Sequence, residues 1–316
     1  MIFSQLKLRK FVWMVSVALA AALAAGCAVS RRTIVKRPSG PPEALQTATK
    51  QQLIDLYDYQ ANSITSMDAA VTMVLTAGSA YTGVIEQYHE VSGFILAQKP
   101  ANVRVIGQVP VVGTDIFDMV SNGETFHIFI PSKNEFVVGP AKLERPSSKP
   151  IENLRPQHLT SALFWEPISL SDPVLFEQTA EGPKAYYVLT IIHRVGPADA
   201  ANAAEANWEI ARKIWFERVK LQVARIQTYD AAGQLASDIR YSDWDRFGAE
   251  RYPRQISLNR PSSDYNLDLH IVHIALNIAI AADRFVLKQP AGTELVRVGE
   301  PKGNAKEGDA PGKDAK

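Results

Sequence analysis

Alternation of apolar and polar residues with a period of two runs through most of the chain after residue 82, and this pattern constrains the fold more than any other feature. Successive side chains of a β-strand point to opposite faces, so such runs indicate strands with one buried face. In 125–130, Phe126, Ile128 and Ile130 share one face and His127 lies on the other. The predicted strands are 82–97, 103–109, 115–120, 125–130, 185–194, 208–217, 221–229, 235–241, 254–258, 267–280 and 285–288.

Two segments have a helical period instead. Leu45, Leu53 and Leu56 recur at helical spacing behind a pair of prolines, which suits the first turn of a helix. In 151–165 the apolar residues fit one side of a short helix. About ten to eleven antiparallel strands with these two helices predict an α+β fold, in which an open or closed barrel is covered on one face by helices.

The single cysteine of the chain, Cys27, follows an N-terminal leader. A basic start precedes an uncharged apolar run, 11–25, which is short for a transmembrane helix and typical of a secretory signal peptide. The sequence LAAGC at 23–27 resembles a bacterial lipobox, in which the leader is cut before the cysteine and the cysteine is lipidated. We therefore expect a signal peptide at 1–26 and a lipid anchor on Cys27. A buried thiol after an ordinary signal peptide is the alternative.

Both flanks of the expected folded domain, 43–298, are polar. Residues 27–42 carry four positive charges and are interpreted as a tether, which is either solvated or in contact with anionic headgroups. Residues 299–316 hold four lysines and four acids without large apolar residues and are predicted to be disordered. Ala28 replaces the aspartate that would retain a lipoprotein in the inner membrane. We expect an outer-membrane anchor with the domain facing the periplasm.

The sequence contains no strong sign of catalysis. The net charge of +1 argues against a nucleic-acid partner, and G-x-S-x-G, H-E-x-x-H, P-loop and C-x-x-C motifs are absent. His270 and His273 are three residues apart in a strand, so we expect them on opposite faces and predict no metal site. Asp243 and Asp245 either form a carboxylate pair or lie on a solvated edge. We expect no cofactor and no enzyme activity; an enzyme with an unrecognised site is an alternative.

Short motifs follow one another in a characteristic order. They are 93–100 (GFILAQKP), Arg104, 120–123 (VSNG), Pro131, Trp215-Phe216, the turn 230–233 (DAAG), Asn277, 285–287 (FVL) and 290–292 (PAG). Together they resemble the outer-membrane lipoprotein carrier and receptor proteins, the LolA/LolB superfamily. The resemblance implies an antiparallel half-barrel with a lid of helices over an apolar concave face, which binds acyl chains of lipids or lipoproteins. A lipidated, tethered chain is similar in layout to the receptor, so we expect a role in lipoprotein sorting.

The resemblance also suggests which side chains contact lipid. Candidates for the cavity lining, each with ordinary core packing as the alternative, are Phe94, Leu96, Phe117, Met119, Phe126, Ile128, Trp215 and Leu276. The lid is expected to contribute Leu159, Leu163 and Trp165. Carrier proteins have an arginine that bonds lid carbonyls before the proline of the first matched strand. Lys99 stands in its place and lacks the bidentate fork.

The loop 108–114 (QVPVVGT) carries apolar residues where a turn usually has polar ones. Pro110 and Gly113 match the proline and glycine of an N-P-L-G loop in the receptor family, and Val111 and Val112 take the place of its projecting leucine. The resemblance implies a loop that contacts the membrane during transfer. The alternative is a tip that folds back into the core.

A second function remains open at this point. An envelope sensor could use the same fold to bind another protein rather than lipid. The segments 199–207 and 252–264 exceed the length of the family and have no assigned role.

Overall fold

The computed structural model describes residues 43–79, 84–87, 89–141, 155–195 and 207–298. The predictions for the signal peptide, Cys27, the tether and the C-terminal tail lie outside the described residues, as does most of 199–207. All helices and strands described below belong to the unit that begins at Ala44. In these ranges, no helix is long and apolar enough to cross a membrane.

The described chain is built mainly of strands. They are β1 (Ser66–Ser79), β2 (Val84–Gln87), β3 (Val91–Gln98), β4 (Asn102–Gln108), β5 (Asp115–Ser121), β6 (Thr125–Ile130), β7 (Glu135–Pro140), β8 (Val174–Glu181), β9 (Lys184–Val195), β10 (Asn207–Glu217), β11 (Gln222–Tyr229), β12 (Leu235–Phe247), β13 (Glu250–Arg260), β14 (Tyr265–Leu276) and β15 (Glu294–Arg297). There are two α-helices, α2 (Lys50–Ser63) and α3 (Pro156–Leu163). Three 3₁₀ turns lie elsewhere in the described chain: η2 (Pro131–Lys133), η5 (Pro261–Ser263) and η6 (Ala282–Phe285).

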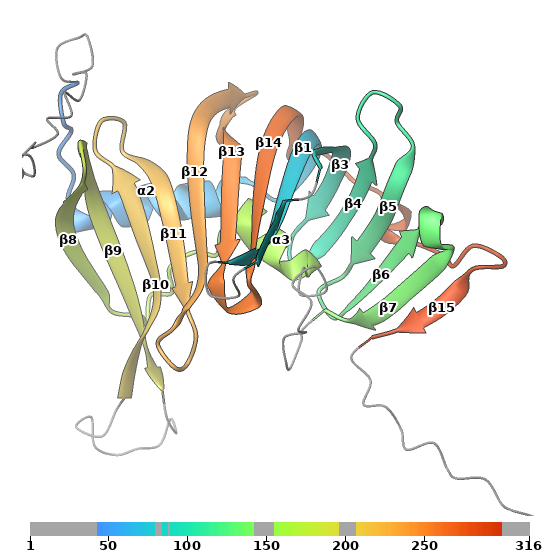
Figure 1. Ribbon diagram of the computed structural model, residues 1–316. Helices are drawn as coiled ribbons and strands as arrows, with labels where there is room; N and C mark the ends of the chain where they lie inside the picture. Colours follow the sequence, from blue (N-terminus) through green and yellow to red (C-terminus); the bar gives the residue numbers. More distant parts are fainter. Residues whose placement is uncertain (1–42, 80–83, 88, 142–154, 196–206, 299–316) are drawn as a thin grey trace, which may run out of the picture. The chain divides into compact units, whose positions relative to one another are not determined.

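All fifteen strands form one open sheet (Figure 1). Fourteen follow the order β15-β7-β6-β5-β4-β3-β1-β14-β13-β12-β11-β10-β9-β8, and β2 pairs with β1 beside this path. Every pair is antiparallel except β15 with β7. Since β8 and β15 stand at the two ends of this order without pairing, the sheet does not close. Of the predicted open or closed barrel, the open antiparallel sheet is confirmed. A helix that acts as a lid over it stays a prediction.

The predicted number of strands is wrong, because about ten to eleven were expected and fifteen are present. The long strand β1 mixes alanine, threonine and glycine with its apolar residues, so its alternation is weak. Strand β8 is exposed along most of its length and shows no buried face. Residues 285–288, in contrast, do not form a strand: η6 ends at Phe285 and irregular backbone follows.

Helix α2 begins later than its leucine spacing predicts. Thr49 accepts a hydrogen bond from the Gln52 backbone N–H at 3.3 Å, and the Gln52 side chain accepts one from the Thr49 N–H at 2.9 Å. This capping box fixes the start of the helix. Leu45 therefore lies before the helix, where half of its surface is exposed. Leu53 and Tyr57, one turn apart, are buried against the sheet.

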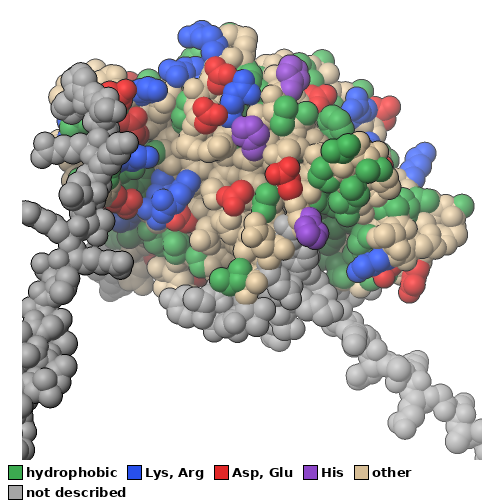
Figure 2. Space-filling model, turned by 45° about the horizontal axis from the view of Figure 1, so that its top comes forward, with side chains coloured by type: hydrophobic (Ala, Val, Ile, Leu, Met, Phe, Trp, Pro, Cys, Tyr) green, Lys and Arg blue, Asp and Glu red, His purple; other side chains and the backbone are tan. Residues whose placement is uncertain are grey.

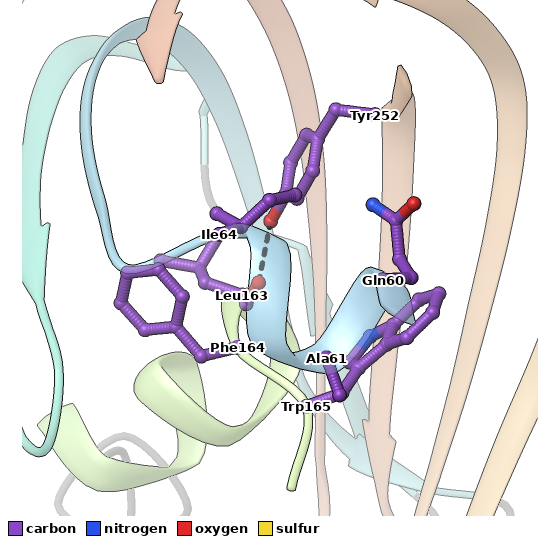
Figure 3. Close-up of a pocket in the computed structure, with 7 residues that line it drawn as sticks. All are labelled: Gln60, Ala61, Ile64, Leu163, Phe164, Trp165 and Tyr252. Atoms are coloured by element: carbon purple, nitrogen blue, oxygen red, sulfur yellow. Dashed lines mark hydrogen bonds between the residues drawn. The ribbon is translucent and has the colours of Figure 1, made fainter. Parts of the chain in front are cut away.

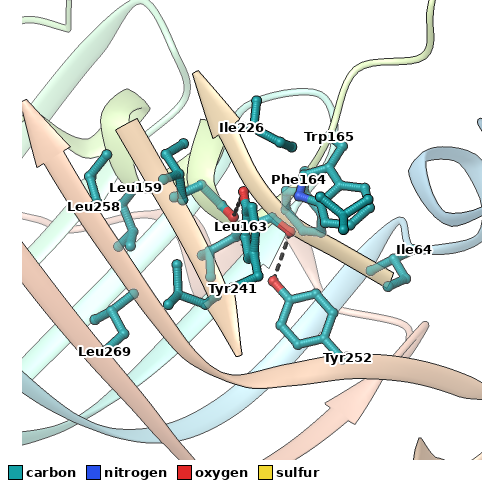
Figure 4. Packing of buried hydrophobic residues seen from close by; sticks show 14 of the residues in the cluster. Ile64, Leu159, Leu163, Phe164, Trp165, Ile226, Tyr241, Tyr252, Leu258 and Leu269 are labelled. Carbon is teal, nitrogen blue, oxygen red and sulfur yellow. Dashed lines mark hydrogen bonds between the residues drawn. The ribbon is translucent and has the colours of Figure 1, made fainter. Parts of the chain in front are cut away.

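The core lies between α2, α3 and one face of the sheet, which we call the inner face (Figure 4). Strands from both halves of the sheet contribute to it. Fully buried members include Met67, Ile95, Leu189, Ile214, Ile239, Ile256 and Leu258. The opposite, outer face carries charges of both signs close together (Figure 2), so no single-sign patch dominates that view.

The five-strand meander β3–β7 and the last five strands, β10–β14, of the seven-strand meander β8–β14 contain the same ion pair. In the first, Arg104 on β4 forms a bidentate pair with Asp118 on β5, with N···O distances of 3.0 and 2.7 Å. In the second, Arg225 on β11 pairs with Asp238 on β12 at 2.6 Å for both bonds. Each pair joins the second and third strands of its five-strand group, so the two halves of the sheet are built alike.

The connection between the fourth and fifth strands is repeated as well. In both meanders a 3₁₀ turn that begins with proline, η2 or η5, ends at a residue with positive φ, Asn134 at 55° or Asp264 at 56°. The segment 252–264, which had no assigned role, therefore consists of β13 and this connection. Two residues of this segment, Ile256 and Leu258, are buried in the core.

The chain after β14 crosses the outer face. Arg104 donates a hydrogen bond from Nη1 to the Arg284 carbonyl at 3.0 Å, and His127 Nδ1 lies 3.4 Å from the Leu287 carbonyl oxygen. Further along, β15 adds to the edge of the sheet beside β7. The C-terminal part of the described chain thus covers the outer side of β4 to β6.

Candidate functional site

Residues 162–168, which we call the exit segment, leave helix α3 and run over the inner face of the sheet. Tyr241 on β12 donates a hydrogen bond to the Ala162 carbonyl at 3.1 Å, and Tyr252 on β13 donates one to the Leu163 carbonyl at 2.8 Å (Figure 4). Burial raises the pKa of both phenols above the ordinary value, so both stay protonated donors. The sheet thereby binds backbone groups that the helix end leaves unpaired.

Lys99 joins the exit segment to α2. Its ammonium group donates one hydrogen bond to the Ala61 carbonyl of α2 and one to the Trp165 carbonyl at 3.4 Å. It also lies 5.8 Å from the centre of the Phe164 ring. Burial lowers the pKa of Lys99. A single ammonium group therefore contacts carbonyls of two segments without the fork of an arginine.

Arg212 holds the far end of the exit segment. Its guanidinium donates to the Glu166 and Pro167 carbonyls, each at 2.8 Å, and lies 5.4 Å from the centre of the Tyr57 ring. The Ile168 N–H donates to the Asp58 carboxylate of α2 at 2.8 Å. Six backbone groups between residues 162 and 168 thus form hydrogen bonds with side chains from other parts of the fold.

The indole of Trp165 is the apolar centre of this arrangement. It stacks on Tyr57 with ring centres 5.3 Å apart and meets Tyr241 and Trp244 edge-on at 5.3 and 6.0 Å. Leu159 and Leu163 of α3 are buried in the same core. The three residues expected in the lid therefore pack on the inner face, and movement of a lid stays a prediction.

A small pocket opens between α2, the exit segment and β13 (Figure 3). It has a cavity volume of about 10 Å³ and is lined by Gln60, Ala61, Ile64, Leu163, Phe164, Trp165 and Tyr252. Pockets for small molecules usually have about 300–1,000 Å³. An acyl chain fits at this place only if the exit segment moves away from the sheet.

Five of the predicted cavity residues belong to the inner face. Met119 pairs with Ile128 and with core residue Val105, and Phe126 is fully buried on the same side. Phe117 lies over Gly107, where a Cβ atom would stand 2.3 Å from the ring. Leu276 pairs with the core residue Met67. Whether these side chains contact lipid stays a prediction.

The other three lie on the outer face, contrary to expectation. Phe94 and Leu96 alternate with the core residues Ile95 and Ala97, and 46% of Phe94 is exposed. In β10 the core side chains are Ile214 and Phe216. Trp215 between them points outward, where Arg225 lies 5.3 Å from its ring centre. Strong apolar runs such as GFILA carry large side chains on both faces, so their pattern did not identify the inner one.

The expectation for His270 and His273 is also wrong, because both lie on the outer face. A β-bulge leaves Val272 without a partner in β1, so that His270 and His273 face Thr72 and Ala70 on one side. Ile271 and Ile274 are both buried in the core. The bulge shifts the alternation by one residue.

The described ranges contain no group of three or more metal-ligating side chains. Asp245 is paired with Arg254 at 2.7 Å on the exposed part of β12 and β13. This agrees with a solvated edge rather than a carboxylate pair with Asp243.

The tip of the β4–β5 hairpin carries the most exposed valines. Val111 is fully exposed and Val112 is 73% exposed. The Val112 N–H donates to the Pro110 carbonyl at 2.8 Å across Val111, whose φ is +69°, and the Gly113 N–H donates to the Val109 carbonyl at 2.9 Å. This γ-turn with positive φ is rare for a β-branched residue. The tip is thus held in shape by its own backbone, and it does not fold back into the core.

Sequence reasoning missed the donors to the exit segment. Tyr241 and Arg212 occur in predicted strands, and Tyr252 occurs in the segment 252–264 that had no assigned role. The partners of all three are backbone carbonyls far along the chain. A tyrosine on the apolar side of a strand was the available signal, since a buried phenol usually has a hydrogen-bond partner.

No protein-family model and no curated protein matches the chain. Among solved structures, it is similar to a LolA superfamily protein from Nitrosomonas europaea, with 14% identity and a TM-score of 0.46 over 76% of this chain and 99% of that one. It is also similar to a DUF1329 family protein from Desulfovibrio piger (10% identity, TM-score 0.46, 74% and 95% covered). A third structure is a putative outer membrane lipoprotein-sorting protein domain from Vibrio parahaemolyticus, with 10% identity and a TM-score of 0.42 over 74% of this chain and 94% of that one. At these identities and TM-scores the likenesses carry no argument about function.

Proposed function

We propose that this protein is a lipid-anchored protein of the bacterial envelope that binds acyl chains of lipids or lipoproteins and takes part in lipoprotein sorting to the outer membrane. The anchor is Cys27 after removal of 1–26, and the folded domain faces the periplasm. Binding is by burial of apolar surface, so no catalytic group or cofactor is needed.

The observation that carries the proposal is the projecting pair Val111 and Val112. Their exposure has no packing reason, and exposed apolar groups in a fixed shape usually have a partner. Transfer of a valine side chain from water into an apolar phase contributes about 1.5–3 kcal/mol. Two such side chains give weak, reversible contact with a bilayer, which suits delivery of an acyl chain.

The acyl chain would occupy the inner face after the exit segment has moved. Five hydrogen bonds to carbonyls of that segment would be lost. The two from tyrosines contribute about 0.5–1.5 kcal/mol each, and the three from Lys99 and Arg212 contribute about 1.5–3 kcal/mol each. Burial of about a dozen methylenes returns roughly 10 kcal/mol at about 0.8 kcal/mol per methylene. The two free energies are of the same order, so binding of an acyl chain and closure of the exit segment compete, and in this proposal the compact arrangement is the state without cargo.

A second candidate is an envelope sensor that binds another protein without lipid. The small pocket beneath the exit segment favours it, because a packed inner face needs no ligand for its stability.

The two candidates differ in copurifying lipid. A Cys27→Ser variant of the full chain, which cannot be acylated at that position, is exported and purified without detergent. Mass spectrometry of extracted lipid should find about one acyl-bearing molecule per chain. A folded protein that carries no lipid and takes up no added palmitate would contradict acyl binding. The envelope sensor would then remain as the candidate function.

A further inference from the structure

A group of cationic and neutral donor side chains lies at the start of helix α3. It consists of Arg155 and His158 from α3, Arg260 at the end of β13 and Tyr265 at the start of β14, and we call it the arginine cluster. His158 Nδ1 lies 2.6 Å from the Tyr265 hydroxyl, and the two rings stack with centres 6.0 Å apart. The connection through η5 thus places Arg260 of β13 and Tyr265 of β14 beside the start of α3.

Arg260 has no counterion in the described part of the chain. Its Nε–H group is buried and has no hydrogen-bond partner. In contrast, Arg104, Arg225 and Arg254 each form an ion pair with an aspartate. Asp264, four residues further on, forms no ion pair with Arg260. A buried charge without a partner is costly, so this guanidinium is suited to a partner from outside the chain.

The field of the cluster is positive. Burial, with the charges of Arg260 and Arg155, lowers the pKa of His158 to about 3, so the imidazole is neutral at neutral pH. His158 Nδ1 and the Tyr265 hydroxyl share one hydrogen bond, in which either can donate. In the tautomer whose Nδ1 accepts from the hydroxyl, Nε2 carries the ring proton and can donate a hydrogen bond to a ligand. Arg155 lies with its guanidinium 5.0 Å from the Phe126 ring centre and adds positive charge.

Arg260 and His158 are partly exposed, whereas Arg155 and Tyr265 are buried at 7% and 3% exposure. Parts of the Arg260 and His158 side chains are therefore accessible from the surface.

We infer that the arginine cluster binds a phosphate group. A guanidinium presents a planar fork of N–H donors that matches two oxygens of a phosphate, and the imidazole N–H offers a further donor to a third. Free phosphate and the phosphate of a lipid headgroup have this chemistry in common. The site does not depend on acyl binding at the inner face, because its donors lie at the start of α3 and not in the exit segment.

The test is a calorimetric titration of the full chain in detergent at constant ionic strength. Three probes separate the sources: inorganic phosphate, dihexanoyl phosphatidic acid, and dihexanoylglycerol without phosphate. We expect saturable binding of the first two. Tighter binding of phosphatidic acid than of phosphate identifies a lipid headgroup, and equal affinity identifies the phosphate group alone. Binding of dihexanoylglycerol reports on the inner face only, so its absence would count against acyl binding and not against this site.

Arg260→Gln is the test variant. Arg246→Gln is its matched control, because Arg246 is an exposed arginine on β12 outside the arginine cluster. Arg260→Gln should weaken phosphate binding about tenfold or more, as expected for the loss of hydrogen bonds to a charged group. Arg246→Gln should bind like the wild type. If Arg260→Gln does not fold, His158→Gln in the same titration should show the loss. Equal affinity in wild type and all folded variants, or no saturable phosphate binding by the wild type, would overturn the inference.

Discussion

Single side chains decide how the exit segment is held. Lys99 contacts both α2 and the exit segment, and Tyr241 and Tyr252 bond consecutive carbonyls at the end of α3. Each contact joins residues far apart in the chain, so each contributes to closure and little to the local helix. Weakening one of them should favour the open state without changing the sheet.

Replacing Lys99 by methionine should make the exit segment easier to open. The loss of a charged donor to two carbonyls is expected to lower the free energy of unfolding by about 1–3 kcal/mol, measured in urea. Palmitate should bind more tightly, because less of its binding free energy is used for opening. Lys133→Met, at an exposed lysine in η2, is the control and should change neither. Unchanged stability and affinity in Lys99→Met would show that Lys99 does not hold the segment.

His158 gives the protein a predictable response to acid. Its folded pKa of about 3 lies below the ordinary histidine value of 6.5, so the unfolded chain binds the proton more readily between these values. The contribution of His158 to stability is present above about pH 6.5 and is lost as the pH falls towards 3. Denaturation between pH 7 and 4 should show a shallower loss of stability for His158→Gln than for wild type. Parallel curves for the two proteins would contradict this assignment.

At the scale of elements, the β4–β5 hairpin carries two neighbouring exposed valines at its tip. Its backbone bonds are local, and Val111 keeps a positive φ that costs about 1–3 kcal/mol in strain. Removal of both valine side chains should therefore leave the fold intact.

The double variant Val111→Ser, Val112→Ser should reduce association of the Cys27→Ser chain with lipid vesicles, measured by sedimentation. Its melting temperature should not fall, since neither side chain is buried. Val272→Ser, at an exposed valine on the bulge of β14, is the control and should keep vesicle binding. Loss of stability without loss of vesicle binding would mean that the tip has a structural role.

Much of the sheet could be predicted, because strands with one buried face show their period directly. The prediction for 125–130 agrees with β6 residue for residue, and α3 falls inside the predicted helical interruption. Phe94 and His273 were placed on the wrong face for physical reasons: one lies in a run that is apolar on both sides, and the other follows a bulge. The donors to the exit segment could not be predicted, since their partners depend on the tertiary fold.

At the scale of the whole folded unit, the proposed function requires movement of one short segment, 162–168, over one open sheet of fifteen strands. Strands β11, β12 and β13 pair with one another through continuous ladders of backbone hydrogen bonds. The exit segment is held instead by hydrogen bonds to side chains such as Arg212 and Asp58. Opening should therefore affect residues 162–168 and leave β12 and β13 unchanged.

Hydrogen exchange of the full chain with and without saturating palmitate tests this claim most directly. The Phe164 amide, bonded to the Thr160 carbonyl at 2.9 Å, and the Ile168 amide, bonded to Asp58 at 2.8 Å, report on the exit segment. Both should exchange faster when palmitate is bound, while amides of β12 and β13 keep their rates. Saturable palmitate binding with unchanged or slower exchange at Phe164 and Ile168 would contradict the account.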